Sequence, residues 1–151
     1  MQAIHSIQVA CAAPALMDVL CDFRSYPEFL PRMQRASVVL DHPPVWEVDF
    51  ELEFVRTLDY TLRLERSPLA LRWTLVRGFF RHNTGSWTLE PNDDGVLATY
   101  TIDLQPNTFV PRTVMNSLLR HELPRTLEAF RDRAQLLTSA VLREGNAPAD
   151  G

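Results

Sequence analysis

The chain has 151 residues, of which 46% are hydrophobic and 23% charged, so its composition excludes the disordered and fibrous classes. Its net charge of -4 argues against general nucleic-acid binding, which needs clustered positive charge. All 15 basic residues are arginine, so the chain has no lysine for a Schiff base or a phosphate-binding loop.

Alternation of apolar and polar residues predicts seven strands, because a strand points successive side chains to opposite faces. The clearest alternation lies between Trp46 and Phe54, where every even-numbered residue is large and apolar. We also expect a bulge at Gly85. In chain order, the expected strands are residues 4–10, 35–40, 45–54, 57–65, 69–75, 79–89 and 96–104.

Three helical segments are expected beside the strands. Pro14 opens a short helix, and residues 26–31 form a second helical turn bracketed by prolines. A long amphipathic helix starts near Pro111 and ends at about Arg143, with Pro124 predicted to kink it. We expect residues 112–123 to form a movable lid and residues 127–141 to be anchored. Its apolar stripe is Met115, Leu118, Leu119, Leu123, Leu127, Phe130, Ala134, Leu137 and Val141.

The absence of internal repeats and linkers predicts one domain over residues 1–144, followed by a flexible tail over residues 145–151. The N-terminal residues have no positively charged region, and no apolar run approaches the ~18 residues of a membrane span. We therefore expect a cytoplasmic protein with no integral membrane segment, in which Cys11 and Cys21 are reduced fillers.

This order of elements predicts an α+β fold. Two short helices lie between the first and second strands, and a bent antiparallel seven-stranded sheet wraps around the long C-terminal helix. The arrangement resembles the START-like, helix-grip superfamily. Residues 23–31 (FRSYPEFLP), 79–82 (FFRH) and 85–91 (GSWTLEP) resemble its polyketide cyclase/dehydrase and coenzyme-Q-binding branch, and the resemblance extends over residues 2 to 140. It implies a ligand-binding fold but no shared catalytic residue, since the family holds lipid and quinone binders, aromatase/cyclases and a ribosome-association toxin.

Metal and catalytic motifs are not expected. The four histidines and two cysteines do not have metal-ligand spacing, so we predict neither a metal nor another cofactor. No Ser-His-Asp arrangement can be assembled. Strand parity places Glu47, Asp49, Glu51 and Glu53 on the solvated face of the sheet rather than in an acid–base cluster.

The predicted interior contains polar groups. Strand parity turns Tyr60, Trp73 and Tyr100 inward together with Asn83 and Arg81. The helical wheel places further polar residues on or beside the sheet-facing side, namely Arg112, Asn116, Glu122 and Thr126. Either they line a wet cavity of several hundred cubic ångströms, or they pair with one another, for example Glu122 with Arg81. The candidate ligand-binding residues are Phe50, Tyr60, Trp73, Arg81, Asn83, Tyr100, Arg112, Asn116, Leu119 and Glu122.

We therefore expect this chain to bind a hydrophobic small molecule such as a lipid, an isoprenoid quinone or a polyketide, with transport or chaperoning of that molecule left open. Two alternatives stay open as well: a polyketide aromatase/cyclase, with Tyr100, Arg81 or Glu122 in proton transfer, and a ribosome-associated interaction protein. The expected partner is the hydrophobic ligand, without nucleic acid, and transient membrane contact is left open. The sequence leaves the oligomeric state open.

Overall fold

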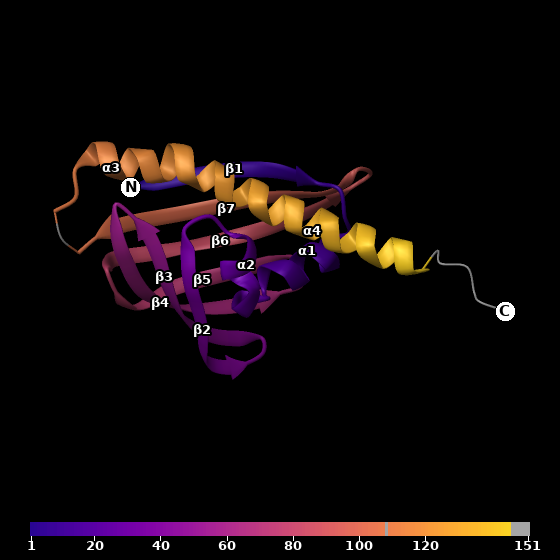
Figure 1. The fold of residues 1–151 in the computed structure, drawn as a ribbon, viewed down its shortest axis with the longest axis horizontal. Helices are drawn as coiled ribbons and strands as arrows, with labels where there is room; N and C mark the ends of the chain where they lie inside the picture. The colour runs from indigo at the N-terminus through magenta and orange to yellow at the C-terminus, as the bar shows by residue number, and fades with distance from the viewer. Residues whose placement is uncertain (108, 146–151) are drawn as a thin grey trace.

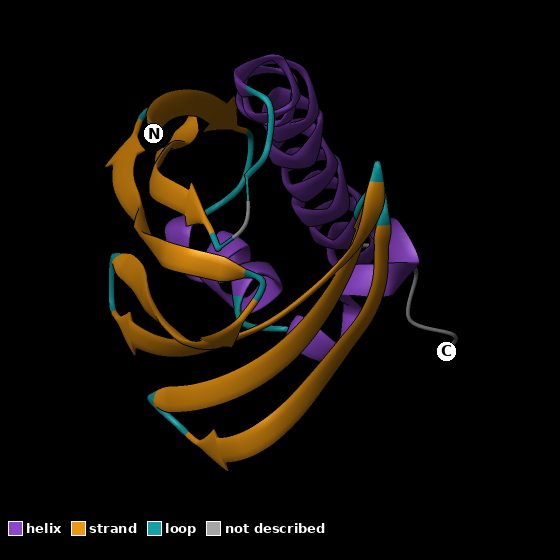
Figure 2. Ribbon diagram, turned by 90° about the vertical axis from the view of Figure 1, so that its left-hand side faces the viewer, coloured by secondary structure: helices purple, strands orange, loops and turns teal. Residues whose placement is uncertain are grey.

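A computed structural model describes residues 1–107 and 109–145, with side chains up to residue 141. It contains a seven-stranded antiparallel sheet, with the C-terminal helix lying along its concave side (Figures 1 and 2). The predicted helix-grip arrangement is thereby confirmed. The strands are β1 (Gln2–Val9), β2 (Met33–His42), β3 (Val45–Phe54), β4 (Arg56–Ser67), β5 (Ala70–Gly78), β6 (Phe80–Asn92) and β7 (Gly95–Pro106).

The sheet order β1-β7-β6-β5-β4-β3-β2 pairs each strand with its neighbour in sequence, except that the first strand pairs with the last. The connection from β1 to β2 therefore crosses from one edge of the sheet to the other. It contains α1 (Ala13–Leu20), a 3-10 turn η1 (Phe23–Ser25) and α2 (Tyr26–Phe29). Phe23 and Leu20 of this connection are almost completely buried, so it covers one end of the concave face.

The predicted alternation is seen most clearly in β3, whose bounds match the expected residues 45–54. Trp46, Val48 and Phe50 are buried, while Glu47 and Asp49 on the other face keep accessible surface. Most other strands begin or end a few residues away from their predicted limits, because ladder pairing continues into the turns.

The predicted bulge at Gly85 is wrong. Gly85 pairs in regular register with Trp73 on β5 and Ile102 on β7, and the irregularity lies between Phe80 and His82. Position 85 requires a glycine for a different reason, which is the lack of space for a side chain. An added Cβ would overlap both the Thr101 carbonyl oxygen and the Trp73 ring. The Trp73 ring thus lies directly over the Gly85 backbone.

The C-terminal helix consists of α3 (Arg112–Ser117), a π-helical turn η2 (Leu118–Glu122) and α4 (Leu123–Gly145). The π turn ends two residues before Pro124, where a proline would otherwise crowd the preceding turn. Such a turn holds more residues than an α turn, so it rotates the side chains that follow it. The expected kink at Pro124 stays a prediction, and what the structure shows there is a π turn on the N-terminal side of the proline.

The apolar stripe of this helix is confirmed up to Ala134. Leu137 and Val141 were expected in the stripe, but they are 41% and 67% exposed. The reason is geometric: the end of α4 extends past the sheet (Figure 1). The predicted tail lies outside the described residues, apart from Gly145, which ends α4. Among the described residues, no helix is long and apolar enough to cross a membrane.

Candidate ligand-binding site

A cavity of about 160 Å³ lies between the concave face of the sheet and the C-terminal helix. It is smaller than the several hundred cubic ångströms expected, because aromatic rings occupy much of the space. The sheet contributes most of its walls, and Leu118, Leu119 and Leu123 close it from the helix. This is the position at which the sequence predicted a ligand site.

Eight aromatic side chains surround the cavity in a continuous series of contacts, with neighbouring ring centroids 5.0 to 5.9 Å apart. Most of these pairs meet edge to face, the arrangement that the charge distribution of aromatic rings favours. The resulting wall is apolar and rigid, and it suits a flat, unsaturated ligand. In order of contact the rings are Phe80, Tyr60, Phe50, Tyr26, Phe130, Trp87, Tyr100 and Trp73.

Three polar groups interrupt this wall. Asn83 is 3% exposed, and its Oδ1 accepts a hydrogen bond of 3.1 Å from the Trp73 indole nitrogen. Asn83 is itself among the residues that line the cavity. The rings of Tyr60 and Tyr100 also line the cavity and keep accessible surface. Tyr26 differs, since its hydroxyl donates to the Leu20 carbonyl oxygen.

The tyrosine hydroxyls are neutral donors over the physiological pH range. Burial raises the pKa of Tyr60 well above its ordinary value, and burial together with the nearby Tyr60 hydroxyl raises the pKa of Tyr100 further. Both tyrosines line the same cavity. Together with the Asn83 amide, they form a group of donors suited to ligand oxygens that accept hydrogen bonds.

This burial predicts an alkaline titration that is coupled to unfolding. All three tyrosines of the chain have raised pKa values, so the folded protein should show no tyrosinate absorbance at 295 nm as the pH passes 10. The unfolded chain releases these protons near pH 10. The free energy of unfolding should therefore fall from about pH 10 upward and be unaffected by the tyrosines below it. A stepwise tyrosinate signal near pH 10 in folded protein would contradict this burial.

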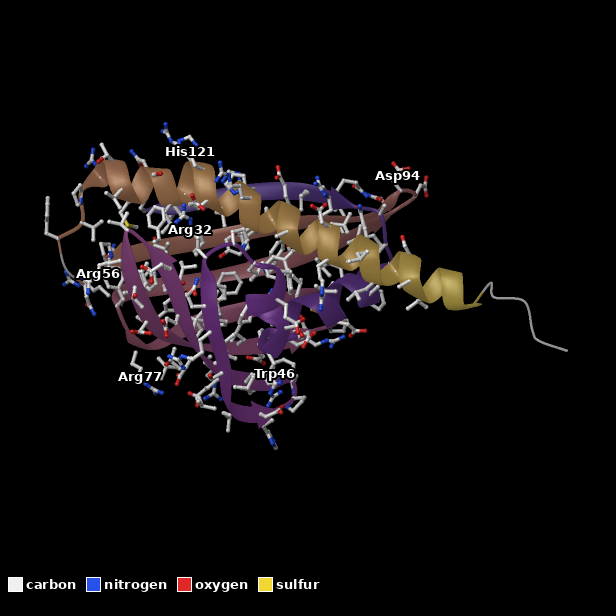
Figure 3. The ribbon with its side chains drawn as sticks, in the orientation of Figure 1. Arg32, Trp46, Arg56, Arg77, Asp94 and His121 are labelled. Atoms are coloured by element: carbon white, nitrogen blue, oxygen red, sulfur yellow. The ribbon has the colours of Figure 1, made fainter. Side chains whose placement is uncertain are left out.

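An ion pair that keeps accessible surface lies among the residues that line the cavity, and we take it to mark the mouth. Arg32 Nε lies 3.0 Å from Glu122 Oε2, and the Arg32 guanidinium lies 5.7 Å from the Phe54 ring centroid. The Arg32 side chain is 45% exposed and that of Glu122 13%. Such a partly exposed pair contributes little to stability, on the order of 1 kcal/mol or less. It can therefore open at low cost. In Figure 3, Arg32 lies beneath the helix whereas His121 points away from the sheet.

Polar contacts hold α4 against the body of the protein. The Gln135 side chain accepts a bond of 2.9 Å from the Ala10 backbone nitrogen, and Arg133 binds Glu28 at 3.0 Å. The expected anchoring of residues 127–141 agrees with these contacts up to Gln135, although Leu136, Leu137 and Val141 are exposed. The expected opening of residues 112–123 stays a prediction.

The structure brings seven of the ten candidate residues to the cavity, and the other three lie elsewhere. Arg81 is exposed because the irregularity between Phe80 and His82 turns Phe80 inward instead. It is therefore Arg32, rather than Arg81, that pairs with Glu122. Arg112 is exposed at the first residue of α3, and Asn116 lies on the flank of that helix, since its buried face is centred on Met115. The seven are Phe50, Tyr60, Trp73, Asn83, Tyr100, Leu119 and Glu122.

Sequence reasoning missed several lining residues. Tyr26, Trp87 and Phe130 were not predicted to line the site, although Tyr26 lies in the sequence that carries the family resemblance. Arg32 was missed completely. It has a positive φ of 65° at the start of β2, and this conformation has no signal in the sequence for a residue other than glycine or asparagine.

No group of three or more His, Cys, Asp or Glu side chains in the described part of the chain is arranged to hold a metal ion. The two cysteines are free, and burial raises the pKa of the Cys21 thiol to about 11. A raised thiol pKa lowers the fraction of reactive thiolate at neutral pH. The chemistry available at this site is therefore that of aromatic contact and neutral hydrogen-bond donors, with one ion pair at the mouth.

Solved structures share this fold over nearly the whole chain. A protein of Thermus thermophilus has a TM-score of 0.83 at 13% identity, covering 91% of this chain and 99% of its own. A START superfamily protein from Mycobacterium smegmatis has a TM-score of 0.79 at 17% identity, covering 90% and 98%. The Zhui aromatase/cyclase from Streptomyces sp. R1128 has a TM-score of 0.76 at 15% identity, covering 89% and 93%. These identities show the fold alone.

No curated protein matches the sequence. A family model described as "Polyketide cyclase / dehydrase and lipid transport" matches residues 9–131, which include every strand from β2 to β7 and the helical residues that close the cavity. The chain belongs to the polyketide cyclase/dehydrase and lipid transport family.

Proposed function

We propose that this protein binds a hydrophobic, aromatic small molecule with carbonyl or similar acceptor oxygens in the cavity between sheet and helix. The observation that carries the proposal is the combination of an aromatic wall with the Tyr60 and Tyr100 hydroxyls and the Asn83 amide. Apolar contact supplies the affinity, and the three donors orient the ligand. A quinone ring or a cyclised polyketide has this chemistry, and the family description is consistent with both.

The size of the cavity limits the ligand. About 160 Å³ lies within the range of a small aromatic ring system, and a longer chain has to leave through the mouth at Arg32 and Glu122. An isoprenoid quinone would then place its head group among the tyrosines and its tail between Arg32 and the helix. The weak ion pair at the mouth is suited to such an exit.

Removal of single hydroxyls tests the role of the donors. Tyr60→Phe and Tyr100→Phe each delete one hydrogen bond worth about 0.5–1.5 kcal/mol, so affinity for a naphthoquinone should fall by roughly three- to tenfold. Tyr26→Phe is the matched control, because the Tyr26 hydroxyl is committed to the Leu20 carbonyl. It should lower stability without lowering affinity. Isothermal titration calorimetry measures the affinities and urea denaturation the stability, and equal affinities for all three variants would contradict the assigned donors.

A second candidate function is polyketide cyclisation with loss of water. It is favoured by two neutral tyrosine donors in the cavity and by the family to which the chain belongs. Proton transfer also needs a base, and Glu122 is the carboxylate among the lining residues that the structure describes. If Glu122 were that base, Glu122→Gln should lower product formation from a poly-β-ketone mimic by ~10²–10⁴ with little change in binding. We expect no product formation to be measurable in the wild type, because the Glu122 carboxylate is paired with Arg32 rather than free to act as a base.

A further inference from the structure

Two apolar side chains protrude into solvent from loops of this protein. Phe109 is 93% exposed in the segment before α3, and Val55 is 80% exposed in the turn between β3 and β4. They are the most exposed large apolar side chains among the described residues. Val55 also has a positive φ of 63°, a strained conformation for a β-branched residue. Packing does not explain either position.

Contacts through Phe79 bring these two loops to the same end of the molecule. The guanidinium of Arg56, next to Val55, lies 5.3 Å from the Phe79 ring centroid. The Asn107 backbone nitrogen donates to the Phe79 carbonyl at 3.0 Å, and its side chain donates to the Gly78 carbonyl at 2.9 Å. In Figure 1 the segment before α3 lies at one extreme end of the molecule, and the label of Arg56 in Figure 3 lies at that same end. We call Val55, Arg56, Phe109 and Arg112 the docking tip.

The docking tip is basic although the whole chain is acidic. Between Asp103 and Glu122 the sequence contains no Asp or Glu, but it contains Arg112 and Arg120. These two and Arg56 are exposed, and none of the three forms an ion pair within the described part of the chain. In a protein of net charge -4, the two unpaired arginines of the docking tip, beside two protruding apolar side chains, are complementary to a negatively charged surface.

The docking tip is also next to the cavity. Phe54 lines the cavity and directly precedes Val55, and Leu118 lines it from the first half of the C-terminal helix. From these observations we infer that the docking tip binds an anionic lipid membrane, with Val55 and Phe109 inserted among the acyl chains and Arg56 and Arg112 at the headgroups. A hydrophobic ligand then passes between bilayer and cavity at one end of the molecule. This last step rests on the proposed function, whereas the docking does not.

Vesicle co-sedimentation tests the docking. The wild-type chain should bind vesicles of phosphatidylglycerol and phosphatidylcholine, and bind pure phosphatidylcholine at least about tenfold more weakly. Val55→Asn with Phe109→Ser should lower partition by about tenfold, since two apolar side chains no longer insert. Asparagine tolerates the positive φ, so this variant should fold. Arg56→Gln with Arg112→Gln should lower partition by roughly twentyfold, and added salt should weaken wild-type binding.

The matched control is Leu136→Asn with Val141→Ser, which removes two exposed apolar side chains from the protruding part of α4. It should partition like the wild type. Absence of wild-type binding to anionic vesicles, or an equal loss in the control, would overturn the docking. A loss only in the arginine variant would also overturn it, because an acidic protein surface would then be the better partner. Naphthoquinone affinity, measured without vesicles, should be unchanged in the docking variants. If the wild type does not bind naphthoquinone, the proposed ligand site is wrong, and the result on vesicle docking is unaffected.

Discussion

Gly85→Ala should lower the free energy of unfolding by about 3 kcal/mol and weaken ligand binding at the same time. The new methyl group would overlap both the Thr101 carbonyl oxygen and the Trp73 ring, so backbone and indole must both shift. Overpacking of a well-packed core costs typically about 1–3 kcal/mol, and contact with backbone places this site at the upper end. A displaced indole also loses its hydrogen bond to Asn83. Urea denaturation and a naphthoquinone titration measure the two effects.

Ser86→Ala is the control for that substitution, because it lies next along β6 and adds no atoms. It should change stability by no more than about 0.5 kcal/mol. If Gly85→Ala were as stable as the wild type and bound ligand equally well, then the close contact of Trp73 with Gly85 would not matter to the site.

Filling the cavity should abolish binding without unfolding the protein. Leu62 is buried on β4 and lines the cavity, so Leu62→Trp would place an indole in the space that we assign to the ligand. We expect affinity for naphthoquinone to fall at least hundredfold, or about 2.7 kcal/mol, with a smaller fall for Leu62→Phe. Near-ultraviolet circular dichroism checks that the fold is kept.

Leu89→Phe is the control for the filled cavity. Leu89 is equally buried on the sheet but does not line the cavity, so overpacking there should lower stability without a matching loss of affinity. A Leu62→Trp variant that remains folded and binds as tightly as the wild type would show that the ligand lies elsewhere.

The fold was largely predictable because its signals are local and repeated. Alternation in β3 fixed both its bounds and its buried face, and the apolar stripe of the final helix was correct up to Ala134. The predicted burial of Leu137 and Val141 was wrong, because both are exposed. Periodicity shows which face of a helix is apolar, but it does not show where the sheet beneath that helix ends. The π turn at Leu118–Glu122 was not predictable for a similar reason, because several backbone solutions relieve the crowding by Pro124.

The site was predictable only where parity holds along an uninterrupted strand. Tyr60, Trp73 and Tyr100 were correctly placed because β4 pairs regularly with β3, and β6 with β7, at these positions. The register shift between β4 and β5 adds its extra residue on β5 beyond Trp73, so it reverses none of the three. The predicted inward orientation of Arg81 was wrong, because the irregularity between Phe80 and His82 turns its side chain to the exposed face. Arg32 depends on a backbone conformation at the start of β2 and on a contact with a helix 90 residues away, and neither leaves a pattern in the sequence.

Intermolecular nuclear Overhauser contacts between a bound naphthoquinone and the leucine methyl groups test the central claim most directly. We predict saturable one-to-one binding, with contacts from the quinone ring to Leu62 and Leu71 of the sheet and to Leu119 of the helix, all of which line the cavity. Methyl groups of the exposed Leu136 and Leu137 should show none. Contacts confined to such surface leucines, or binding that never saturates, would contradict a ligand site between the sheet and the helix.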